Sequence, residues 1–101
     1  GSELAVYVYP VSSGMQVDAA SIRAYLAPQT VTDIRETALG TVVRGLLFTS
    51  RLPDGSRTIN LWAAYNGRVY TIQAPIEDID LFTFISQRWF FAPATPSAPR
   101  N

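Results

Sequence analysis

The sequence predicts a single α+β domain, built on an antiparallel sheet of about four to five strands with one helix near each end, in the order β-α-β-β-β-β-α. Two observations carry this prediction. Segments rich in β-branched and aromatic residues follow one another through the middle of the chain, and two of them flank Asn66-Gly67, the strongest short-range hairpin signal. Amphipathic segments lie near both ends. Adjacent hairpins with helices outside them are typical of the α+β class.

The length and composition fit one domain. The chain has 101 residues, of which 48% are hydrophobic and 12% aromatic, enough apolar surface for one core without disulfides. Residues 1–3 are interpreted as N-terminal residues that include a cloning scar, Gly1-Ser2. Residues 4–91 are predicted to form the domain. Residues 92–101 are rich in Pro and Ala and are predicted to be an extended tail or linker.

The first strand is predicted over residues 4–11. Val6 and Val8 alternate with Tyr7 and Tyr9, so the two pairs face opposite sides of the strand. We expect this strand to be buried on at least one side.

A short amphipathic helix is predicted over residues 19–27. Asp18 can cap its N-terminus, and Ile22, Tyr25 and Leu26 fall at the i, i+3, i+4 spacing of one apolar stripe.

Two strands are expected next. Residues 31–37 alternate poorly between apolar and polar side chains and are interpreted as an edge strand, whereas residues 41–50 form a strongly apolar, β-branched segment. The residues that follow, 52–56, contain Pro, Asp and Gly in the order typical of a tight turn.

The hairpin around Asn66-Gly67 joins predicted strands over residues 57–65 and 68–74. A type I′ turn needs positive φ at both central residues, which Asn and Gly tolerate, and it fixes the register by counting. The expected pairs are Tyr65 with Arg68, Ala63 with Tyr70 and Leu61 with Ile72 on one face, and Ala64 with Val69 and Trp62 with Thr71 on the other. Both faces are apolar, so we expect this hairpin to be central and covered on both sides.

The last helix is predicted from residue 79 to about residue 87. Asp78 or Glu77 can cap it, and Leu81, Phe84 and Ile85 fall at helical spacing. Residues 88–91 are expected to leave the helix as a short terminal strand.

The composition excludes several chemistries. Cysteine and histidine are both absent, which removes disulfides, thiolate zinc sites, the usual general base and every Ser-His or Cys-His pair. Acidic and basic residues number eight each, so no net field draws the chain to nucleic acid or to an anionic membrane. No segment approaches the roughly 18 apolar residues that span a bilayer. We expect no catalytic residue, no metal site and no cofactor.

Other functions remain as alternatives. A small carboxylate-dependent hydrolase or lyase would need a cleft that holds two of Asp33, Glu36, Asp54 and Glu77. The acidic run of Glu77, Asp78 and Asp80 is interpreted as an ordinary helix start and not as a cation site. A single-stranded nucleic-acid binder would need a contiguous surface of arginine and aromatic side chains, for which six residues are candidates. These residues are Arg44, Arg51, Arg57, Arg68, Trp62 and Tyr65.

The aromatic run Trp89-Phe90-Phe91, just before the predicted tail, is the main candidate for a functional contact. Three large rings in a row either close the core or leave one ring exposed to anchor a partner. The candidate partner contacts are Trp62, Tyr65, Arg68, Trp89, Phe90 and Phe91.

A resemblance covers about half of the chain. Residues 41–91 comprise a strand, a turn, a strand, the run Asn-Gly-Arg-Val-Tyr-Thr-Ile, a Pro, an Asp-containing helix and a closing aromatic group. This order resembles the C-terminal half of PsbP/Mog1-like domains. The chain departs from that family in being shorter and in ending with Arg-Trp-Phe-Phe. The resemblance implies a non-enzymatic, often extracytoplasmic lipoprotein or an accessory protein that docks on a larger assembly.

These observations predict a non-catalytic binding or assembly module. We expect the extracytoplasmic domain of a bacterial, envelope-associated or membrane-anchored protein, such as a sensor, an anti-sigma-type domain or an accessory subunit. Its expected location is periplasmic or extracytoplasmic, with the membrane reached only through flanking sequence. The expected partner is another protein of an envelope complex or a second copy of the chain.

Overall fold

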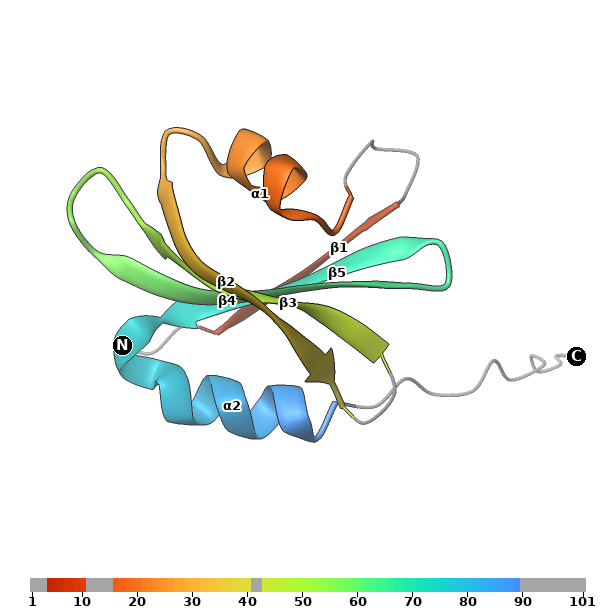
Figure 1. The fold of residues 1–101 in the computed structure, drawn as a ribbon. Coiled ribbons are helices and arrows are strands. Elements are labelled where there is room, and N and C mark those ends of the chain that lie inside the picture. The colour runs from red at the N-terminus through yellow and green to blue at the C-terminus, as the bar shows by residue number, and fades with distance from the viewer. Residues whose placement is uncertain (1–3, 11–15, 41–42, 90–101) are drawn as a thin grey trace, which may run out of the picture.

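The chain folds into three layers, with a five-stranded antiparallel sheet between two helices (Figure 1). A computed structural model describes residues 4–10, 16–40 and 43–89. Along the chain, the strands are β1 (Ala5–Pro10), β2 (Thr30–Leu39), β3 (Val43–Arg51), β4 (Arg57–Tyr65) and β5 (Arg68–Pro75), and the helices are α1 (Ala19–Leu26) and α2 (Ile79–Gln87). The predicted α+β class and element order are therefore confirmed. The terminal strand expected over residues 88–91 is not formed by Arg88, which caps the end of α2, or by Trp89; Phe90 and Phe91 lie outside the described residues.

The sheet has the order β1-β5-β4-β3-β2, in which β2 to β5 form consecutive antiparallel pairs and β1 adds to the far side of β5. All five cross-strand pairs predicted for the β4–β5 hairpin are observed, including Tyr65 with Arg68 and Trp62 with Thr71. Asn66 and Gly67 both have positive φ, at 52° and 77°, as a type I′ turn requires. The turn residues therefore set the register of the two central strands.

β2 is an edge strand, as predicted, and it contains an irregularity. Its pairing with β3 shifts between Thr32 and Arg35, so that Asp33 and Ile34 together lie opposite Phe48. Asp33 has a φ of 58°, which lies in the left-handed region that Asp tolerates better than most residues. This extra residue bends the edge and interrupts its ladder of hydrogen bonds.

The layer between α1 and the sheet holds one of two apolar clusters. Ile22 of α1 is fully buried and packs in a cluster with Phe48 and Trp62 of the sheet. The helix begins where the sequence predicts, because the side chain of Asp18 accepts a hydrogen bond of 2.7 Å from the backbone N–H of Ser21.

The layer between α2 and the opposite face of the sheet holds the second cluster. Phe82 of α2 packs in a cluster with Leu61 and Ile72 of the central strands, with Trp89 at its margin. The apolar spacing that identified this helix does not mark its buried face, since Leu81 and Phe84 are exposed. Phe82 and Ser86 face the sheet instead.

The start of α2 also differs in detail from the prediction. A single 3-10 turn, Ile76–Asp78, precedes the helix, and Asp78 occupies the N-cap position without a side-chain hydrogen bond to the helix. At the other end, the N–H of Gly40 donates a hydrogen bond of 2.7 Å to the carbonyl of Ser86, which ties α2 to the end of β2. Glycine at position 40 allows this close approach, because a Cβ there would collide with the backbone of Trp89.

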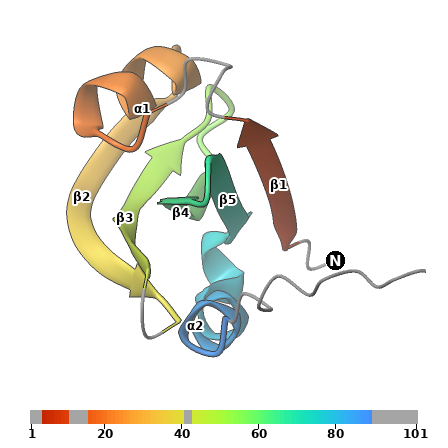
Figure 2. The ribbon, with the colours of Figure 1, turned by 90° about the vertical axis from the view of Figure 1, so that its right-hand side faces the viewer.

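β1 is less buried than the sequence predicts. We expected at least one buried side, but Val6, Tyr7 and Val8 are 40%, 48% and 48% exposed. The reason is position: β1 is at an end of the sheet, and among the described residues no strand lies on its outer side (Figure 2). Within the described part of the chain, no helix is long and apolar enough to cross a membrane.

Candidate functional site

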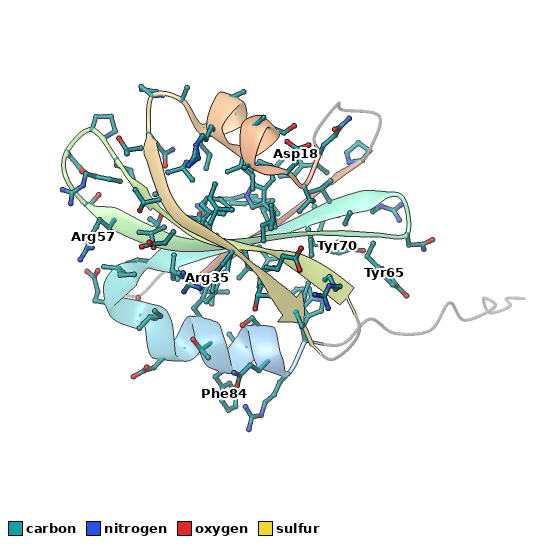
Figure 3. The ribbon with its side chains drawn as sticks, viewed as in Figure 1. Asp18, Arg35, Arg57, Tyr65, Tyr70 and Phe84 are labelled. Atoms are coloured by element: carbon teal, nitrogen blue, oxygen red, sulfur yellow. The ribbon has the colours of Figure 1, made fainter. Side chains whose placement is uncertain are left out.

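The six predicted contact residues do not form one surface. Trp62 is 3% exposed and lies on the α1 side of β4, so its ring belongs to the core. Trp89 is partly buried on the opposite side of the sheet, where its ring centroid lies 6.4 Å from that of Tyr70. Tyr65 is exposed at the end of the β4–β5 hairpin (Figure 3). Its cross-strand partner, Arg68, is also exposed. Phe90 and Phe91 lie outside the described residues.

The four carboxylates of the hydrolase alternative lie on three segments, with Asp33 and Glu36 both on β2. Asp33 is in the irregular part of β2, and Glu77 is in the 3-10 turn before α2. Glu36 of β2 forms an exposed ion pair with Arg44 of β3, with 2.9 Å between oxygen and nitrogen. Of the four carboxylates, only that of Glu36 lines one of the two surface hollows described below. In the described residues, no three acidic side chains come together as a metal site would require.

Asp54 has an ordinary role in the β3–β4 turn. Its carboxylate accepts hydrogen bonds from the N–H and the hydroxyl of Ser56, at 2.8 Å and 2.6 Å. These bonds lower the pKa of Asp54 because they stabilise the charged form, the hydroxyl contributing most. The geometry is that of an Asx turn, and it explains the residue without a catalytic role.

A buried polar cluster lies between β3 and β4 on the α1 side. The hydroxyls of Ser50 and Thr58 are 2.6 Å apart, and the amide nitrogen of Asn60 donates to both, at 3.1 Å each. Because these groups satisfy one another, they have a structural explanation and need no ligand.

The surface hollow on the α1 side lies close to the sheet edge formed by β2. It measures about 300 Å³ and is lined by Val17, Leu46, Ala64, Gly45 and the Glu36–Arg44 pair. The arginine is already paired with a carboxylate, so this hollow does not present an unsatisfied charge to a ligand.

A row of aromatic rings runs from the outer strand into the core on the α1 side. Ring centroids are separated by 6.5 Å from Tyr7 to Tyr9, 6.2 Å from Tyr9 to Tyr25, 5.6 Å from Tyr25 to Trp62 and 6.1 Å from Trp62 to Phe48. We call these five residues the aromatic row. Burial, and then a hydrogen bond with Tyr25, raise the pKa of Tyr9 above its usual range. The outer end of the row, Tyr7, is exposed.

The outer side of α2 is an exposed apolar surface. Leu81 and Phe84 are 44% and 53% exposed, and Ile85 is partly exposed beside them. Phe84 points away from the sheet (Figure 3). The guanidinium of Arg88 lies 4.1 Å from the centre of the Phe84 ring, a cation–π contact. We call Leu81, Phe84, Ile85 and Arg88 the α2 outer surface; the last three follow Leu81 by three, four and seven positions, so all four lie on one side of the helix.

The α2 outer surface includes an open hollow. It measures about 340 Å³ and is lined by Phe84, Ile85, Arg88 and Trp89. Its walls are mostly apolar, with one cationic group at the rim. Among the described residues, no carboxylate forms an ion pair with Arg88. The hollow therefore suits an apolar side chain accompanied by a negative charge.

Sequence reasoning identified the apolar residues of α2 but not their exposure. A helix that carries apolar residues on two sides leaves one side outside the core, and spacing alone does not say which. The second signal was in the sequence: Phe82, Ser86 and Trp89 also follow helical spacing.

Comparison with known proteins does not identify this chain. No family model, no curated protein and no solved structure gives a significant match to it.

Proposed function

We propose that this chain is a non-catalytic module that binds another protein through the α2 outer surface. The observation that carries the proposal is the outward position of Leu81 and Phe84, which are large apolar side chains about half exposed on a helix already packed against the sheet by Phe82. Exposed apolar patches of this kind are typical of docking sites, because burying them removes apolar area from water.

The chemistry of the α2 outer surface supports a particular kind of partner. An apolar side chain would fill the hollow beside Phe84 and Ile85, and a carboxylate on the partner would meet Arg88. Arg88 favours such a contact because the Phe84 ring holds its guanidinium in place, which lowers the entropy lost on pairing. We therefore propose a partner segment with apolar side chains followed by an acidic residue.

The proposal includes an extracytoplasmic setting in a bacterial envelope, where the partner is a subunit of a larger assembly. The resemblance of residues 41–91 to PsbP/Mog1-like domains supports this setting. Fractionation of cells that express the full-length protein checks the location.

The test is a binding experiment with two matched variants of α2. Phe84→Glu places a charge in the centre of the surface, whereas Gln87→Glu adds the same charge at an exposed position of α2 outside this surface. We expect the native chain and Gln87→Glu to recover the same envelope protein, and Phe84→Glu to lose it. Arg88→Glu alone should weaken recovery, and more strongly at low salt than at high salt.

Two results would overturn the proposal. One is equal recovery of the partner by both glutamate variants. The other is the recovery of no partner together with turnover of a small substrate by the purified chain. Circular dichroism of each variant establishes that the fold is retained.

A further inference from the structure

The two edges of the sheet are built differently. β2 carries Asp33, Arg35 and Glu36 and has an irregular register, features with which proteins prevent strands from pairing at an edge. β1 has the sequence Ala-Val-Tyr-Val-Tyr-Pro, with no charged residue and a regular register against β5 along its whole length. Within the described residues, the charges and the irregular register that protect the β2 edge are absent from β1, whose Pro10 lies at its end.

The direction of the backbone groups of β1 follows from two independent observations. The hydroxyl of Thr71 lies 3.4 Å from the carbonyl oxygen of Tyr7, so this carbonyl points toward β5. Counting from the β4–β5 turn gives the same result, because Thr71 belongs to the set of β5 residues whose backbone groups face away from β4. Since directions alternate along a strand, the N–H and C=O groups of Val6 and Val8 point outward.

Outward-pointing groups at Val6 and Val8 permit a self-complementary pairing. When two copies of β1 lie antiparallel about a two-fold axis at Tyr7, Val6 of one copy lies opposite Val8 of the other, and the two exchange hydrogen bonds. Tyr7 then faces Tyr7 of the second copy. Pro10, which has no N–H to donate, falls at the end of the paired segment, opposite Leu4.

The side chains are compatible with this register on both faces. Val6 and Val8, which are 40% and 48% exposed, meet their counterparts on the α2 side of the sheet. The Tyr7 pair forms on the α1 side and joins the aromatic rows of the two copies. Because β1 is uncharged, no like charges are brought together.

We propose that the chain forms a symmetric homodimer through antiparallel pairing of β1 with β1 of a second copy, centred on Tyr7. The pairing joins two sheets into one ten-stranded sheet, since each copy contributes five strands. The inference does not depend on the α2 outer surface, which lies on a different element. A six-residue strand gives a small interface, so the dimer forms in a concentration-dependent manner.

Light scattering coupled to size exclusion, over a range of protein concentrations, measures the mass of the purified chain. We expect the mass to rise from 11.1 kDa toward twice this value as concentration increases. A mass of 11.1 kDa at every concentration overturns the proposal. That is the result expected if a flanking segment of the chain, or a strand of another protein, occupies the edge instead.

A charge-swap experiment tests the register. Because Tyr7 faces its own counterpart, Tyr7→Lys and Tyr7→Glu each place like charges opposite one another and should weaken the dimer by roughly tenfold. An equimolar mixture of the two variants should restore it, since lysine then faces glutamate. Unrestored mass in the mixture, or a dimer unaffected by either variant alone, refutes pairing centred on Tyr7.

Two further variants separate pairing from folding. Val8→Pro removes an N–H that points outward in the monomer, so it should abolish the dimer while β1 keeps its bonds to β5. Thr32→Lys adds a charge to the other edge of the sheet and should leave the dimer unchanged. Phe84→Glu should also leave it unchanged, which distinguishes a failure of this inference from a failure of the proposed docking surface.

Discussion

The orientation of α2 gives a sharp quantitative prediction, because two phenylalanines of the same helix have opposite environments. Phe82 is 2% exposed and packs on the sheet, whereas Phe84 is 53% exposed. Truncating a buried phenylalanine to alanine costs about 3 to 5 kcal/mol, a large part of the stability of a small domain. The milder Phe82→Leu should therefore cost about 1 to 2 kcal/mol, and the identical change at Phe84 no more than about 0.5 kcal/mol.

Urea unfolding followed by circular dichroism measures both free energies under the same conditions. In a thermal experiment, the loss for Phe82→Leu corresponds to a decrease in Tm of about 4 to 16 °C for a domain of this size. An equal or larger loss for Phe84→Leu would mean that α2 packs through the opposite side, and it would remove the basis for the α2 outer surface.

Four other predictions concern single residues. Asp18→Ala should lower the free energy of unfolding by about 1 kcal/mol through loss of the N-cap bond, and an unchanged value would mean that this bond is not formed in solution. Gly40→Ala should lower the Tm more than Gly55→Ala does. Both glycines have positive φ, but only at Gly40 would a Cβ collide with the backbone that follows α2. Equal decreases in Tm would contradict this close approach. Asn60→Ala should cost about 1 to 3 kcal/mol, since the hydroxyls that it joins lose a buried partner, and urea unfolding checks this value. The raised pKa of Tyr9 means that the folded state holds the phenol proton more tightly than the unfolded state does. The stability that this gives is complete below the usual tyrosine pKa of about 10 and is lost as pH rises through the raised pKa. Tyr9→Phe should therefore make the loss of stability at alkaline pH shallower, and an unaltered pH profile of the free energy of unfolding would contradict this prediction.

The parts of the fold that local chemistry determines could be predicted from the sequence. Asn66 and Gly67 permit only a narrow set of turns, and a two-residue turn leaves one register for β4 and β5. Asp18 similarly fixes the start of α1, because a carboxylate at that position satisfies a free N–H of the first turn.

Features that depend on tertiary packing could not be predicted in the same way. The buried side of α2 is the side on which Phe82 packs against the sheet and on which the carbonyl of Ser86 accepts a hydrogen bond from Gly40, and both contacts exist only in the assembled fold. The exposure of β1 depends on its place at an end of the sheet, which strand composition does not encode. The irregularity at Asp33 needs the partner strand to be defined, since it consists of two residues facing one.

The candidate surfaces show the same division. Aromatic residues were predicted to contact a partner. The predicted set included Trp62, which the fold buries, and did not include Tyr7 or Phe84, which the fold exposes. Exposure is a property of the assembled layers, so a list of large side chains does not distinguish core from contact.

The two tryptophans give the molecule a pair of built-in optical probes. Trp62 lies in the cluster beneath α1, and Trp89 lies at the margin of the cluster beneath α2, on opposite faces of the same sheet. Chains that retain only one of them, through Trp89→Phe or Trp62→Phe, would report the melting of each layer separately by fluorescence. The central strands supply side chains to both clusters, so unfolding of one layer exposes the strands on which the other layer packs. The two emission signals should therefore change at the same denaturant concentration.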